Sequence, residues 1–213
     1  MSDIFREIDE ELRRENLLKL WSRYGKYVIV AAVLALAIAG AVAAWRSHQA
    51  SERRAQSGRY SAALALVREG KNADAARLFA GLSQESGGYG LLASFEEAEL
   101  LAKSGDRKGA VAAYDRLAAS SGIDREFRDL AVLLSVTHGL PDDDPKVAIE
   151  RLQRLTENGN PWRASALELT AGAKLKASDR NGALDIYKAL ADDPSAPQRL
   201  RARAAELAAA LAP

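Results

Sequence analysis

The chain has 213 residues, of which 48% are hydrophobic and 28% charged, with a net charge of +1 and no cysteine. The near-neutral charge excludes the basic surface that nucleic-acid binders use, and the missing cysteine excludes disulfides and thiolate chemistry. The same lack of cysteine leaves the redox compartment open.

Residues 1–26 form a charged head with six basic and six acidic residues. Apolar residues recur in it at helical spacing, which predicts an amphipathic helix: Ile4, Phe5, Ile8 and Leu12. Two interpretations stay open. The helix lies on a membrane surface or in solvent, or it docks to a cytoplasmic partner.

An uncharged apolar run follows from Tyr27 to Trp45, with nineteen residues between Lys26 and Arg46. As a helix it spans about 28 Å, close to the ~30 Å hydrocarbon core of a bilayer. Aromatic residues mark both ends (Tyr24 joins Tyr27 at the first), and the two flanking cations reach the headgroups. Because the run has no polar face, it predicts a membrane span over residues 27–45 better than a buried helix of a soluble protein.

A cleaved signal peptide is the nearest alternative, because Ala41-Val42-Ala43 resembles a cleavage site. The long head with its six acids argues against it. Five basic residues precede the run and four follow it within fifteen positions, which is a weak signal for orientation. A short head before a long domain is typical of a signal anchor with a cytoplasmic N-terminus.

Residues 46–56 are predicted to be a helical linker, and residues 57–213 a repeat domain. Four segments share a small residue, a large apolar residue four positions later and a leucine three positions after that. The small residues are Ala75, Ala110, Ala148 and Ala183, with spacings of 35, 38 and 35. The large residues are Phe79, Tyr114, Leu152 and Tyr187, and the leucines are Leu82, Leu117, Leu155 and Leu190.

This period matches the tetratricopeptide repeat, in which helical hairpins stack because one hairpin alone cannot bury its apolar face. The predicted fold class is therefore all-α: a single N-terminal transmembrane helix followed by a tetratricopeptide-like helical-hairpin solenoid. It has about four hairpins and a capping helix from Leu200 to Leu211. The first helices keep the small position at Ala63, Ala98 and Ala171 but lack the usual Trp and Tyr.

Turn and cap residues separate the predicted helices. Gly70-Lys71-Asn72, Gly105-Asp106 and Ser178-Asp179 are expected between the two helices of a pair, with Asn or Asp as the cap. Asp144-Pro145 and Asn160-Pro161 are each expected to place a capping residue before proline at the first helical position.

No residue pattern indicates catalysis. His48 and His138 lack partners at metal-ligand spacing, so we interpret them as surface or helix-end residues. Asp142-Asp143-Asp144 lacks the spacing of a calcium loop, and Gly87-Gly88-Tyr89-Gly90 lacks the lysine of a phosphate loop, so both predict turns. We therefore predict a protein that is not an enzyme and that binds no cofactor, metal or nucleic acid.

The order of head, span and small repeat domain resembles the ancillary SecYEG translocon subunit family, the YfgM-like proteins of bacterial inner membranes. The local runs that carry the resemblance are Gly25-Lys26, Trp45-Arg46 with Ser47-His48-Gln49, Tyr89-Gly90-Leu91-Leu92-Ala93-Ser94, Trp162 with Ala164, and Gly182-Ala183. It implies a cytoplasmic N-terminus and a periplasmic repeat domain. It also implies association with the SecYEG-type translocon and with a periplasmic chaperone of the peptidyl-prolyl isomerase type, assisting proteins as they emerge.

First helices line the concave face in this fold class, which predicts a groove for a peptide or helix. Its candidate residues are Tyr60, Phe95, Glu96, Glu99, Lys103, Thr137 and Glu168. Leu64, Leu133 and Leu169 belong to the same face or to the core. The alternative to an interaction scaffold is a membrane-anchored regulator that sequesters a cytoplasmic factor through its N-terminal helix.

Overall fold

The computed structural model describes the backbone of residues 2–212, and the side chains of residue 18, residues 21–27 and residues 29–212. The described part is helical and contains no strand, which confirms the predicted all-α class. The chain divides into two compact units, Met1–Ala55 and Gln56–Pro213.

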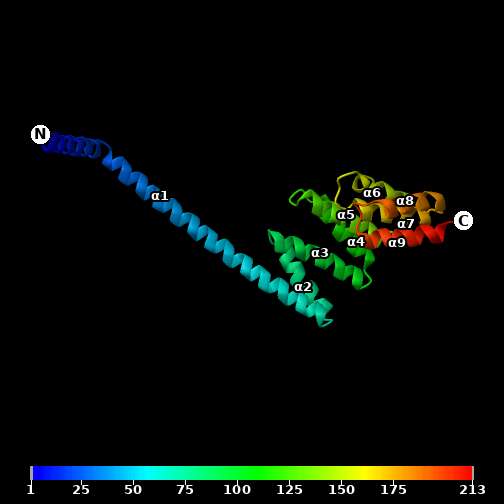
Figure 1. The fold of residues 1–213 in the computed structure, drawn as a ribbon. Coiled ribbons are helices and arrows are strands. Elements are labelled where there is room, and N and C mark those ends of the chain that lie inside the picture. The colour runs from blue at the N-terminus through cyan, green and yellow to red at the C-terminus, as the bar shows by residue number, and fades with distance from the viewer. Residues whose placement is uncertain (1, 213) are drawn as a thin grey trace. The chain divides into compact units, whose positions relative to one another are not determined.

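Helix α1 (Ser2–Arg68) supplies the first unit and continues into the second (Figure 1). The predicted head lies within this helix. The side chains of its apolar stripe, Ile4, Phe5, Ile8 and Leu12, lie outside the described residues, so the stripe stays a prediction.

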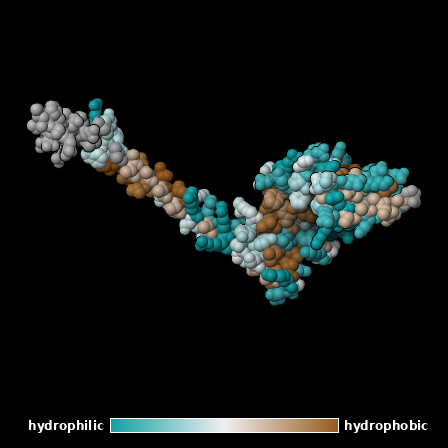
Figure 2. Space-filling model, viewed as in Figure 1, coloured by the Kyte–Doolittle hydropathy of each residue, from teal (hydrophilic) through white to brown (hydrophobic). Residues whose placement is uncertain are grey.

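The apolar run of α1 exposes its side chains. Leu36 is 74% exposed, and Figure 2 shows the run as a brown stretch of hydrophobic surface. Within the described residues, this is the one helix long and apolar enough to cross a membrane. Among the described residues, none of the apolar window of this helix is buried.

The second unit is a stack of four helical hairpins and a terminal helix (Figure 1). The hairpins pair the end of α1 with α2 (Asn72–Ser83), α3 (Gly88–Lys103) with α4 (Arg107–Ala119), α5 (Arg125–Gly139) with α6 (Pro145–Leu152), and α7 (Arg163–Lys176) with α8 (Arg180–Asp192). Helix α9 (Gln198–Leu211) packs on α7 and α8 and covers the last hairpin, as predicted.

The predicted repeat positions form the core of this stack. The seven small residues are at most 3% exposed: Ala63, Ala75, Ala98, Ala110, Ala148, Ala171 and Ala183. The large residues of the second helices are at most 4% exposed: Phe79, Tyr114, Leu152 and Tyr187. Small residues where helices cross let the backbones approach, and the aromatic rings and leucines fill the remaining space.

Most predicted turns and caps are confirmed. The carboxylates of Asp106 and Asp179 accept hydrogen bonds from the Gly109 and Gly182 amides, both at 2.9 Å. Asp144 caps α6 in the same way, with Pro145 at the first turn. In the fourth hairpin Ser178 takes the left-handed conformation, with φ of 64°.

Two predicted caps are wrong. Helix α2 begins at Asn72 itself, after Lys71, and has no side-chain cap. Helix α7 begins at Arg163, two residues after Pro161. The Asn160 side chain holds the turn ahead of α7 and not the helix itself. Its Oδ1 accepts from the amide of Trp162, the residue just before the helix, and its Nδ2 donates to Asp129 at 2.9 Å.

The third hairpin also departs from the predicted regular helix at its end. Helix α6 stops at Leu152, and a 3₁₀ turn, η1 (Gln153–Thr156), follows. The tighter turn still buries Leu155, the predicted third repeat position.

Candidate partner-binding surface

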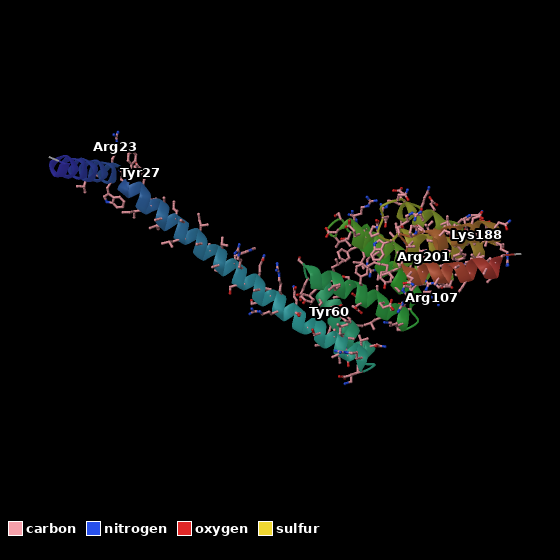
Figure 3. All side chains as sticks on the ribbon, viewed as in Figure 1. Arg23, Tyr27, Tyr60, Arg107, Lys188 and Arg201 are labelled. Atoms are coloured by element: carbon pink, nitrogen blue, oxygen red, sulfur yellow. The ribbon has the colours of Figure 1, made fainter. Side chains whose placement is uncertain are left out.

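Tyr60, on the last turns of α1, contacts the middle of α3 (Figure 3). Its hydroxyl donates a hydrogen bond to Glu96 at 3.3 Å. Its ring packs against Phe79 and Tyr89, with centroids 5.6 and 5.7 Å away. Burial, and next the charge of Glu96, raise the pKa of Tyr60, so the phenol stays a hydrogen-bond donor that holds the carboxylate.

Glu99, one turn further along α3, is the centre of a second polar group. Its carboxylate accepts one hydrogen bond from the Tyr114 hydroxyl at 3.4 Å, and it lies 3.3 Å from His138 Nε2 and 3.4 Å from Lys103 Nζ. The Tyr114 and His138 rings stack, with centroids 5.6 Å apart. Burial, and next the charge of Glu99, raise the pKa of Tyr114.

Phe95, between Leu92 and Glu99 on α3, contacts two aromatic rings. Its ring lies 6.1 Å from Tyr114 and 6.5 Å from Phe127 of α5. Phe127 is 38% exposed, and Leu92, one turn earlier on α3, is 43% exposed. We call this region the α3 surface, formed by Leu92, Phe95, Glu96 and Glu99 of α3 with Tyr60 and Phe127.

The structure therefore brings together five of the seven predicted groove residues: Tyr60, Phe95, Glu96, Glu99 and Lys103. The other two have partners elsewhere. Thr137 is exposed, and its hydroxyl donates to the Leu133 carbonyl of its own helix. Glu168 pairs with Arg203 of α9, whose Nη2 lies 2.6 Å away, and this hydrogen bond and charge raise the pKa of Arg203.

Three leucines were predicted to belong either to the groove face or to the core, and all three contribute to the core. Leu133 is buried, and Leu64 and Leu169 are partly buried against neighbouring core side chains.

Sequence reasoning missed two residues of the α3 surface, Leu92 and Phe127, and one residue that contacts it, His138. His138 is predicted to be a surface or helix-end residue without a partner at metal-ligand spacing, and the structure places its Nε2 beside Glu99, 39 positions earlier in the sequence. The sequence does not indicate Leu92 or Phe127 as groove residues. Their exposure depends on which loops lie beside them, which the repeat pattern does not encode.

The five predicted membrane-interface residues are exposed at the ends of the apolar run: Tyr24, Lys26, Tyr27, Trp45 and Arg46. The Lys26 ammonium lies 5.2 Å from the centre of the Tyr27 ring, and Arg23 lies 6.0 Å from that of Tyr24. Cation–π pairs of this kind suit an interface where one side is apolar and the other wet. Among the described residues, no group of three or more His, Cys, Asp or Glu is placed to hold a metal ion.

Stacked hairpins, buried small residues at a period of about 35 and a terminal capping helix define the class of tetratricopeptide-like helical-repeat proteins. The family model for the tetratricopeptide repeat-like domain matches residues 19–208, and the chain belongs to this family. The matched range includes the apolar run as well as all four hairpins. No curated protein matches the chain.

Proposed function

We propose that this protein is a non-enzymatic scaffold, anchored in a membrane by the apolar run of α1, that binds partner proteins at the α3 surface. Repeat solenoids of this kind are built for protein–protein contacts because their stacked helices present extended surfaces. One observation carries the proposal: Leu92 and Phe127 stay 43% and 38% exposed beside Glu96 and Glu99, whose carboxylates are held by tyrosine hydroxyls.

The resemblance to the YfgM-like family supports a finer proposal. The head (residues 1–26) is cytoplasmic, residues 27–45 span the bacterial inner membrane, residues 46–56 are a linker and residues 57–213 are periplasmic. The repeat domain associates with the SecYEG-type translocon and a periplasmic chaperone, and assists emerging polypeptides. Deleting residues 1–16 separates this proposal from the regulator alternative, since a scaffold keeps its translocon association without the head.

The orientation gives a direct expectation. Alkaline phosphatase fused to the C-terminus is expected to be active, because this enzyme folds only outside the cytoplasm, and green fluorescent protein at the same place is expected to be dark. A fluorescent fusion without phosphatase activity would place the repeat domain in the cytoplasm and contradict the orientation.

Charge reversal tests the binding surface. Glu96→Lys places a cation where the Tyr60 hydroxyl now meets a carboxylate, and it reverses the charge that this part of the α3 surface presents to a partner. We expect the yield of partners crosslinked in intact membranes to fall at least about tenfold, which corresponds to ~1.4 kcal/mol.

Glu97→Lys is the matched control for this experiment. Glu97 is on the same helix, but it lines a different groove with Ala76 and Arg77 of α2. An equal loss of partners with both variants, or no loss with Glu96→Lys, would contradict binding at the α3 surface.

A further inference from the structure

A cavity of about 640 Å³ opens beside the α3 surface. It lies where the start of α3 and the loop before it meet the end of α4 and the loop before α5. Its walls carry five large apolar side chains: Leu91, Leu92, Leu117, Ile123 and Phe127. Its volume falls within the range of about 300–1,000 Å³ that is typical of ligand pockets.

One residue of the cavity wall, Leu117, is at a repeat position that is buried in the other three repeats. Leu82, Leu155 and Leu190 are at most 1% exposed, whereas the equivalent Leu117 is partly exposed at the cavity wall. Apolar surface gains about 25 cal/mol per Å² when it leaves water, so these walls favour an apolar occupant. Figure 2 shows hydrophobic surface on the repeat unit in the region of α3.

Several glycines line the cavity, and the backbone requires a glycine at only some of these positions. Gly87 has a φ of 109°, and a Cβ on Gly90 would lie 2.0 Å from the Glu85 carbonyl, so the fold explains both of these. A Cβ on Gly88 would meet no atom within 4 Å, and one on Gly122 would come no closer than 3.9 Å to its neighbours. Small residues at these two places keep the cavity open.

The charged groups at the cavity are acidic. Its lining includes Glu85 and Asp124 and no Lys, Arg or His. Glu85 pairs with Arg59, which lowers the pKa of the carboxyl, whereas the Asp124 side chain makes no capping hydrogen bond to α5. Glu96 is the next acid along α3, one turn beyond Leu92. A peptide that is bound in the apolar cavity and runs along α3 would therefore next reach the Glu96 carboxylate.

We infer that this cavity is an anchor site for a partner polypeptide segment with a bulky apolar side chain and a Lys or Arg about two residues away. The spacing follows from the helix. Four residues from Leu92 to Glu96 rise about 6 Å, and an extended peptide covers that length in roughly two residues. This inference rests on the proposed function, because it names the chemistry of the partner that the α3 surface binds.

Selection of random peptides on the full chain in lipid nanodiscs tests the inference. The enriched peptides are expected to share a Phe, Leu, Trp or Met with a Lys or Arg about two residues away. Leu92→Asp is expected to weaken their binding at least about tenfold, because it places a charge in the apolar wall. Val147→Asp, at a 49% exposed position outside the cavity, is expected to leave binding unchanged.

A second pair of variants tests the cavity by filling it. Gly88→Trp is expected to weaken the same peptides, and Gly81→Trp, at a helical glycine that also faces open space, is its control. Circular dichroism checks that all four variants keep their helix content. An acidic consensus, a consensus without an apolar residue, no enrichment, or binding unaffected by both cavity variants would overturn the inference.

Failure of this inference differs from failure of the proposed function. If no peptide is enriched while Glu96→Lys still removes crosslinked partners, only the anchor site is wrong. If the peptides bind as expected while Glu96→Lys leaves the membrane partners unchanged, the anchor site stands and the proposed scaffold function is wrong.

Discussion

Replacing Phe79 with alanine is expected to lower the free energy of unfolding of the repeat unit by about 3–5 kcal/mol. Phe79 is fully buried among Ala63, Ala75 and Leu82, and its ring contacts Tyr60 edge to face. The loss combines the transfer energy of the ring with the cavity that it leaves between the first two hairpins. Because Tyr60 also holds Glu96, the same change is expected to loosen the α3 surface.

Denaturant unfolding of the full chain in detergent, followed by circular dichroism, measures this effect. Leu78→Ala is the control, since Leu78 is the neighbouring residue but is 36% exposed. We expect the control to cost less than about 1 kcal/mol. If Phe79→Ala also costs less than about 1 kcal/mol, the hairpin core does not depend on the aromatic residue of the second helix.

Replacing Leu36 with arginine is expected to release the protein from the membrane. Leu36 lies at the middle of the apolar run, and its side chain is 74% exposed. An arginine at the centre of a spanning helix costs about 2.5–3.5 kcal/mol of insertion energy. Alanine fills much of this run, so its larger residues carry most of the favourable insertion energy.

Extraction of membranes with alkaline carbonate distinguishes the outcomes. The wild-type chain and Gln49→Arg, a change beyond the end of the run, are expected to stay in the membrane pellet. Leu36→Arg is expected to move largely into the soluble fraction. If Leu36→Arg is retained as well as the control, the apolar run is not what holds the protein in the membrane.

The fold could be predicted because its strongest signals are local and periodic. A small residue at each helix crossing and a large one four positions later recur every 35 residues or so, and all of these positions are buried. The aspartate caps at Asp106, Asp144 and Asp179 depend on the next few residues alone, and they were predicted correctly. Both signals are set by the chain itself, before any hairpin meets its neighbour.

Side chains whose partners lie far along the chain could not be predicted. Asn160 was expected to cap α7, but it is held by the buried Asp129, 31 residues away. Asp115 joins Ser135 and Arg151 across three helices, and no spacing in the sequence indicates this network. Which side chains meet depends on how neighbouring hairpins are aligned along each other. The pattern of buried residues in the sequence does not determine this alignment.

The candidate site was predictable only in part, for the same reason. The first-helix rule places Tyr60, Phe95, Glu96 and Glu99 near one face, and the structure brings them together. The rule does not foresee that His138 and Tyr114 meet at Glu99, or that Leu117 stays partly exposed while its equivalents are buried. The conformations of the loops before α3 and α5 decide the cavity, and short glycine-containing loops carry little periodic signal.

Site-specific photo-crosslinking in intact membranes tests most directly whether the α3 surface binds partner proteins. A photoreactive residue would replace Leu92 at the α3 surface, or Leu78 on α2 as the control, since both positions are exposed. We predict that position 92 crosslinks to defined proteins, among them a subunit of the translocon or a periplasmic chaperone, and that position 78 does not. No protein adduct at position 92, or the same adducts at both positions, would contradict the account.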